Sequence, residues 1–207
     1  AITWVTPEIL RQIAYGDTPR GGVAVFDAPP PRTLDALNLP ADPLVVILVG
    51  IEKPGNAGAV FRSADAVGAD AVILCQCDCD LFNPNLIRSS LGTVFGLPSA
   101  TASQSETIQW LGEQRIRAFA AIVGATQTFW EVDYRGPAAL VLGSEAQGLD
   151  DAWRPESSSA PGTANGVSAR HELTAVSIPM LGIADSLNVS VTAAALLFEA
   201  RRQRAGF

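Results

Sequence analysis

The chain has 207 residues, 48% of them apolar, which is enough to bury the core of one medium-sized domain and excludes disorder along the whole chain. The formal charge of -7 argues against a broad surface for non-specific nucleic-acid binding. The apolar runs are far shorter than the ~20 residues of a membrane span, and no signal-peptide pattern opens the chain. We therefore expect a cytoplasmic protein without a membrane partner.

The first 43 residues differ in character from the remainder. They are rich in Pro and Gly, and Val23–Phe26 is their one candidate strand. The chain also begins with Ala1 rather than Met. We interpret residues 1–43 as a linker or the remnant of an N-terminal domain of a longer protein, and residues 44–207 as the main domain.

Strands and helices alternate from residue 44 onward. Leu44–Val49 is a continuous apolar run, which is typical of a strand covered on both faces. A helix is expected over residues 57–67, and the strand Ala71–Leu74 completes a β-α-β unit. The later segments are a helix or loop at 85–94, a helix at 105–113, and strands at 118–123 and 138–142. This alternation predicts an α/β fold with a mostly parallel sheet flanked by helices.

The stretch Ser177–Ala195, SIPMLGIADSLNVSVTAAA, predicts a buried strand that runs into a loop and then into a core helix. Just before the helix, the polar residues Ser186, Asn188 and Ser190 alternate with apolar ones. Helix capping explains one such residue but does not need three. We interpret the stretch as a binding site at the start of a helix. The preceding residues, 155–170, are rich in Ser, Pro and Gly and predict a mobile loop.

Two further loops follow predicted strands, where ligands of open α/β sheets gather. In the first, Asn56 is a candidate helix N-cap. Arg62 needs either an ion pair or a role in a site, because its helix is otherwise largely apolar. In the second, two glycines flank Glu145, which lets a bound group approach the backbone, although an ordinary turn would have the same sequence. Neither loop matches a phosphate-binding or dinucleotide motif, and no paired nucleophile and base is evident.

The three cysteines alternate near the end of a predicted strand, so their thiols face one side of it. They are Cys75, Cys77 and Cys79. Structural zinc prefers four ligands, usually in C-x-x-C pairs, and the single histidine, His171, is distant in the sequence. We therefore expect reduced thiols and no metal site.

A local basic patch is compatible with an acidic chain, because a patch depends on where the charges gather rather than on their sum. The arginines are unevenly spread along the sequence. The candidates for such a patch are Arg62, Arg88, Arg115, Arg117, Arg201, Arg202 and Arg204.

Taken together, the three loops carry a resemblance that none of them carries alone. N-x-G-x-x-x-R at Asn56–Arg62, LVLGSEAQGL at Leu140–Leu149 and SIPMLGIADSLNVSVTAA at Ser177–Ala194 resemble, in order and spacing, the three motifs of the SpoU (TrmH-like) family of SPOUT RNA methyltransferases. Arg88–Gly92 also resembles the family's R-x-S-x-G segment. The resemblance covers roughly residues 44–205.

The resemblance implies a SPOUT-type α/β knot, with a C-terminal trefoil knot, that works as a homodimer. It also implies methyl transfer from S-adenosylmethionine to a ribose 2'-hydroxyl of RNA. The catalytic residues that it implies are Arg62, Asn56, Glu145, Asn188 and Ser190. The cofactor-binding residues that it implies are Leu142, Gly143, Ser144, Ile178, Met180, Ser186, Leu187 and Asn188.

We therefore expect a ribose 2'-O-methyltransferase acting on 23S rRNA. The alternatives are a tRNA 2'-O-methyltransferase, an antibiotic-resistance rRNA methylase, or a catalytically idle RNA-binding scaffold, which the intact Arg62, Glu145 and Asn188 argue against. Residues 21–25 resemble the end of an RNA-binding domain that precedes the catalytic domain in rRNA-modifying members. One departure from the family pattern is Ala146, where the second motif usually has Gly, and another is the longer insert before the third motif.

Overall fold

The computed structural model describes residues 1–15, 21–77, 79–145, 147–155 and 172–206. Ala146, His171 and all but the first residue of the predicted mobile loop therefore lie outside the described residues. The chain forms two compact units, Ala1–Pro30 and Pro31–Phe207. None of the helices within the described ranges is long and apolar enough to cross a membrane.

The first unit contains one short helix, α1, Pro7–Ile13. Thr6 caps it, because the Thr6 hydroxyl accepts a hydrogen bond from the Ile9 amide at 3.4 Å. The predicted strand Val23–Phe26 is wrong, since these residues are extended and exposed without a pairing strand. A strand needs a neighbour for its backbone groups and cover for its apolar side chains.

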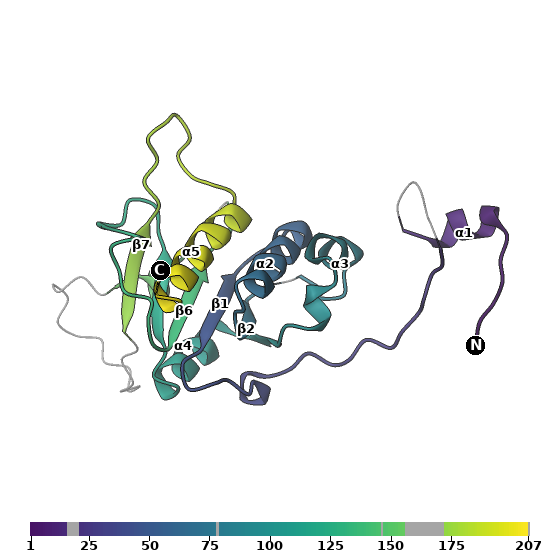
Figure 1. Cartoon of the computed structure of the whole chain (residues 1–207), viewed down its shortest axis with the longest axis horizontal. Coiled ribbons are helices and arrows are strands. Elements are labelled where there is room, and N and C mark those ends of the chain that lie inside the picture. The colour runs from purple at the N-terminus through teal and green to yellow at the C-terminus, as the bar shows by residue number, and fades with distance from the viewer. Residues whose placement is uncertain (16–20, 78, 146, 156–171, 207) are drawn as a thin grey trace. The chain divides into compact units, whose positions relative to one another are not determined.

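The second unit is built on a seven-stranded sheet with the order β3-β2-β1-β6-β4-β7-β5 (Figure 1). All of the strand pairs that the structure describes are parallel. The strands are β1 Leu44–Val49, β2 Ala71–Cys75, β3 Ser99–Ala102, β4 Arg117–Ala121, β5 Gln127–Thr128, β6 Ala138–Leu142 and β7 Leu173–Ser177. The predicted parallel α/β fold is confirmed, and the sequence analysis missed the two short edge strands β3 and β5.

Helices cover both faces of the sheet. The helices are α2 Pro54–Ala66, α3 Pro84–Ser90, α4 Gln104–Glu113 and α5 Val189–Arg204, and the short 3-10 turns are η1 Leu34–Ala36, η2 Thr93–Phe95 and η3 Asp151–Trp153. Pro54 and Pro84 each stand at the start of a helix, where proline's missing N–H is not needed. Ser103 and Glu106 form a capping box at the start of α4.

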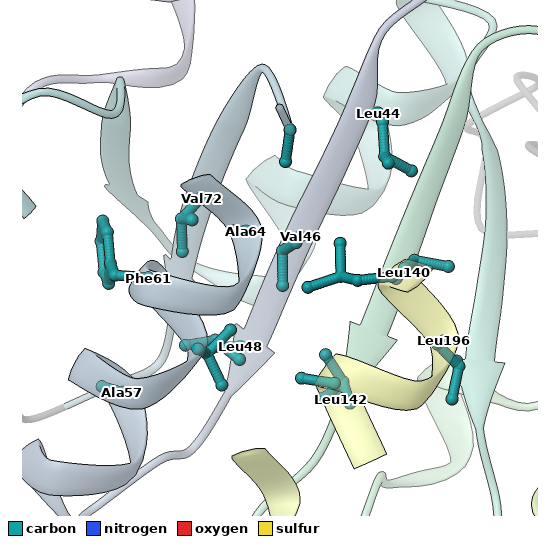
Figure 2. Close-up of a cluster of buried hydrophobic side chains, with 14 of the residues drawn as sticks. Leu44, Val46, Leu48, Ala57, Phe61, Ala64, Val72, Leu140, Leu142 and Leu196 are labelled. Atoms are coloured by element: carbon teal, nitrogen blue, oxygen red, sulfur yellow. The ribbon is translucent and has the colours of Figure 1, made fainter. Parts of the chain in front are cut away.

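The strand β1 contributes side chains to two hydrophobic clusters, one on each face of the sheet. Leu44, Val46 and Leu48 face the cluster that α2, α3 and α5 cover (Figure 2). Val45 and Ile47 face the opposite cluster, which α4, η1 and η3 cover. Because alternate residues of a strand point to opposite faces, a strand buried on both sides must be apolar throughout, as this one is.

The end of β7 differs from the prediction. The strand ends at Ser177, so the expected buried strand beyond that residue is wrong. Pro179 has no N–H to donate to a ladder. Beyond Ser177 the chain forms a loop in which Leu181 and Ile183 are fully exposed, and α5 then begins at Val189. The stretch is therefore a loop and a helix.

Candidate functional site

A pocket of about 360 Å³ lies where the carboxyl ends of β4, β6 and β7 meet. The two loops that follow β6 and β7 and the first turn of α5 complete its wall. Its lining residues are Ala121, Ile122, Val123, Leu142, Gly143, Ser144, Glu145, Gln147, Gly148, Leu149, Arg154, Val176, Ile178, Met180, Asp185, Ser186, Leu187, Val189 and Thr192. The size is within the range of ordinary small-molecule sites.

The structure brings together almost all of the predicted cofactor-binding residues. Leu142, Gly143, Ser144, Ile178, Met180, Ser186 and Leu187 line the pocket, and Asn188 lies immediately beyond them in the chain. The wall that follows β4, residues 121–123, was not predicted from the sequence, and neither were Arg154 and Thr192. Since β4 lies between β6 and β7 in the sheet, the order of the strands would have revealed the β4 wall.

Gly143 makes a close approach of two backbone segments possible. A Cβ atom at this position would meet the backbone of Gly148, and it would lie 2.7 Å from the amide nitrogen of Leu149. The loop folds back on itself here, because the Gly148 amide donates to the Ser144 carbonyl at 2.9 Å. Glycine at position 143 therefore lets this loop of the pocket wall close tightly on itself.

Polar side chains from the three motifs meet at the rim of the pocket. The Asn56 amide donates to Glu145 Oε1 at 3.0 Å. The Asn188 amide donates to the same Glu145 oxygen and, at 3.2 Å, to Asn56 Oδ1. On the other side of the carboxylate, Lys53 Nζ donates to Glu145 Oε2 at 3.3 Å. Glu145 thus joins the loop after β6 to the starts of α2 and α5.

The helix starts explain why these amides face the carboxylate. Pro54 begins α2, so Lys53 is its N-cap and the predicted N-cap role of Asn56 is wrong. Asn188 is the N-cap of α5, and its Oδ1 accepts from the Ser190 amide at 2.9 Å and from the Ser190 hydroxyl at 2.6 Å. Capping by Oδ1 leaves the Asn188 NH₂ group to bind Glu145.

The surrounding donors stabilise the charged form of Glu145. The pKa of Glu145 lies below its usual value, mainly because Lys53 donates a hydrogen bond to the carboxylate. The charge of Lys53 and the hydrogen bonds from Val189 and Asn56 also lower this pKa, whereas burial raises it. At neutral pH the Glu145 side chain is therefore a carboxylate.

The glycine of the first motif has a packing role. A Cβ atom on Gly58 would collide with the Ser89 hydroxyl and the Leu86 carbonyl of α3. Only glycine lets α2 and α3 pack this closely. The N-x-G motif thus combines one residue that faces the site, Asn56, with one that faces a neighbouring helix.

Arg62 is not at the pocket. It lies on the exposed side of α2 and is absent from the lining residues. Within the described part of the chain, no hydrogen bond or ion pair of Arg62 supports the alternative of a structural ion pair. The apolar residues Phe61 and Ala64 face the core, which leaves Arg62 on the side turned to solvent.

The three C-terminal arginines of the predicted basic patch lie in the last turn of α5, where they also make specific contacts. Arg201 donates to the carbonyls of Val67 and Gly68. Arg204 donates to four carbonyl groups and pairs with Asp42. Arg202 pairs with Glu199 at 2.7 Å.

The three cysteines are free, and Cys77 has a structural role. Its sulfur accepts from the Ile51 amide at 3.3 Å and donates to the Leu48 carbonyl at 3.2 Å. Burial raises the pKa of Cys77 to about 11, so its thiol is protonated at neutral pH. No group of three or more His, Cys, Asp or Glu side chains within the described ranges could hold a metal ion.

Comparison with known proteins gives a consistent result. The model of the SpoU rRNA Methylase family matches residues 43–159. A 23S rRNA (uridine(2479)-2'-O)-methyltransferase from Streptomyces viridochromogenes is 32% identical over 207 residues, covering 97% of this chain and 67% of that protein.

Two solved structures are also similar. An RNA 2'-O ribose methyltransferase matches with a TM-score of 0.71 and 43% identity, covering 85% of this chain and 62% of that chain. The SpoU methyltransferase AviRb from Streptomyces viridochromogenes, in complex with the cofactor AdoMet, matches with a TM-score of 0.74 and 33% identity, covering 86% of this chain and 67% of that one. The chain thus spans about two thirds of the length of these relatives. With its three motifs gathered around one pocket and a family match over more than half its length, the chain belongs to the SpoU rRNA methylase family.

Proposed function

We propose that the chain is an S-adenosylmethionine-dependent RNA methyltransferase that modifies a ribose 2'-hydroxyl of 23S rRNA. The observation that carries the proposal is the meeting of Asn56, Glu145 and Asn188, one from each motif, at the rim of a pocket of small-molecule size. The relatives named above support the reaction, because one is a 23S rRNA 2'-O-methyltransferase and another holds AdoMet.

The pocket has the chemistry that S-adenosylmethionine requires. Gly143 and the loop after β7 offer backbone groups to the adenosine part, with Leu142, Ile178 and Leu187 as apolar walls. Met180, Ser144 and Ser186 lie beside them. The carboxylates of Glu145 and Asp185 favour a cationic ligand. When bound, the cofactor supplies a sulfonium methyl group for transfer to a nucleophilic oxygen.

The polar cluster holds the reacting groups in position. A displacement at a methyl carbon requires the ribose oxygen to lie in line with the breaking S–C bond, and fixed amide groups achieve such alignment at low entropic cost. Asn188 is held by Glu145 and by Ser190, so its side chain is fixed before the substrate arrives. We assign Asn56, Glu145, Asn188 and Ser190 to this positioning set.

Arg62 acts from a second copy of the chain in this proposal. Within one copy it is exposed and away from the pocket. We therefore propose a homodimer in which the Arg62 of one copy lies at the pocket of the other. A guanidinium keeps its positive charge and is a poor proton acceptor. Arg62 therefore stabilises the developing charge on the ribose oxygen and contacts the adjacent phosphate, while the proton of the 2'-hydroxyl leaves to solvent water.

Three further features belong to the same proposal. The C-terminal part, which includes the loop after β7 and α5, forms a trefoil knot. Residues 1–43 are a linker or the remnant of an RNA-binding domain, and 44–207 are the catalytic domain. The enzyme acts in the cytoplasm, where ribosomes are assembled.

The experiment that tests the proposal compares wild type with Arg62→Ala. The variant is expected to lose methyl transfer while its affinity for S-adenosylmethionine, measured by titration calorimetry, changes less than about twofold. Arg135→Ala is a matched control, because Arg135 is an exposed arginine paired with Asp133 outside the pocket. Mapping of 2'-O-methyl groups in 23S rRNA and tRNA from a deletion strain identifies the substrate. Failure of the folded wild-type protein to bind the cofactor contradicts the proposal.

A further inference from the structure

The pocket contains a single cation among its described lining residues. This cation is Arg154, and the same lining includes two carboxylates, Glu145 and Asp185. Glu145 is engaged with Lys53 and two amides, whereas Arg154 takes no part in that cluster. Arg154 also lies outside the three sequence motifs.

The backbone that carries Arg154 is firmly anchored. The preceding residue, Trp153, is completely buried between the sheet and α4. Its indole N–H donates to Gln104 Oε1 at 3.2 Å, and the Gln104 amide donates to Asp150 Oδ1 at 3.1 Å. A buried tryptophan with a satisfied N–H fixes the turn around it. Arg154 therefore projects from a fixed point at the edge of the pocket.

The guanidinium of Arg154 is available to a ligand. Among the described residues it forms an ion pair with Asp151, at 3.5 Å, and the two side chains are 55% and 103% exposed. An exposed pair of this kind contributes ~0–1 kcal/mol. The guanidinium can therefore leave Asp151 and pair with a carboxylate bound in the pocket at a small cost in free energy.

We propose that Arg154 binds the α-carboxylate of the methionine part of S-adenosylmethionine. This inference rests on the proposed function, because it assigns a contact to the cofactor of that reaction. The cofactor carries two positive groups, the sulfonium and the ammonium, and one carboxylate. The pocket lining carries the opposite charges, two carboxylates and one guanidinium. A guanidinium binds a carboxylate through two parallel hydrogen bonds, which gives direction as well as charge.

The test is a calorimetric titration of the full chain with two ligands, S-adenosylmethionine and decarboxylated S-adenosylmethionine, which keeps the sulfonium and the ammonium. Arg154→Ala is expected to weaken binding of the first ligand about tenfold and to leave binding of the second unchanged. The expected factor is the low end for a charge-assisted hydrogen bond at an exposed group. Arg154→Lys is expected to recover part of the loss, and Arg135→Ala serves as the control arginine outside the pocket.

Each other outcome has a distinct meaning. An equal loss for both ligands overturns the inference, because Arg154 then shapes the pocket without contacting the carboxylate. No loss for either ligand also overturns it, and a higher KM for RNA in that case assigns Arg154 to a phosphate. If the folded wild type binds neither ligand, the proposed function fails and the inference fails with it. Circular dichroism of each variant confirms that the protein is folded.

Discussion

The side chain of Arg204 connects the end of α5 to the segments that precede β1 and β6. Its guanidinium donates to the carbonyls of Tyr134 at 3.1 Å, Asp42 at 3.1 Å and Pro43 at 3.0 Å, and to that of Gly136. The side chain is only 9% exposed. We predict that Arg204→Met, which keeps the apolar stem, destabilises the protein.

The size of the effect follows from what each carbonyl keeps. The Pro43 carbonyl retains a hydrogen bond from the Ala138 amide at 2.9 Å, and Asp42 is exposed, so water replaces the donor there. The carbonyls of Tyr134, a buried residue, and of half-buried Gly136 have no other donor among the described residues. An unsatisfied buried group costs about 1–3 kcal/mol. Burial of the guanidinium in the native protein offsets part of this cost, so we expect the free energy of unfolding to fall by about 2–4 kcal/mol.

Urea unfolding followed by circular dichroism, at one fixed protein concentration, measures the loss. The corresponding fall in Tm is roughly 5–15 °C for a chain of this size. Arg135→Met is the matched control, because Arg135 forms an ion pair with Asp133 in which the two side chains are 70% and 51% exposed. Such a surface pair contributes ~0–1 kcal/mol. Equal stabilities of the two variants would refute the role given to Arg204.

Two further predictions concern the pocket. Gly143→Ala is expected to weaken S-adenosylmethionine binding more than about tenfold, because the new methyl group forces the loop away from Gly148. Gly55→Ala is the control and is expected to have no effect, because Gly55 has open space around it. Equal affinities of the two variants in calorimetry would contradict this prediction. Lys53→Met is expected to raise the pKa of Glu145 toward its ordinary value, because Lys53 is the main cause of its lowering. The carboxylate charge is present above this pKa and is lost as the pH falls through it, so the polar cluster of the variant should break at a higher pH. An NMR titration of the Glu145 carboxyl measures the shift, and an unchanged midpoint would show that Lys53 does not control it.

The sequence alone determined most of the elements from residue 44 onward, except the short edge strands β3 and β5, and the places where function lies along the chain. The apolar run Leu44–Val49 is buried on both faces, as its composition required, because the composition of a strand reflects which of its faces are covered. The polar residues after β6 and β7 do lie in the loops at the carboxyl ends of those strands. Motif spacing also sufficed to recognise the family, since the three motifs follow strands or start helices whose order is fixed along the chain.

Only the tertiary structure decided which of these residues meet. The neighbours of β4 in the sheet, and therefore the wall at residues 121–123, depend on long-range packing that no local pattern encodes. The same holds for Lys53, which reaches Glu145 across 92 positions of sequence. Arg154 belongs to none of the sequence motifs. It lines the pocket because the buried Trp153 fixes the turn that carries it. Periodicity arises within one element, whereas a site arises from contacts between elements, and those contacts are fixed by the packing of the whole sheet.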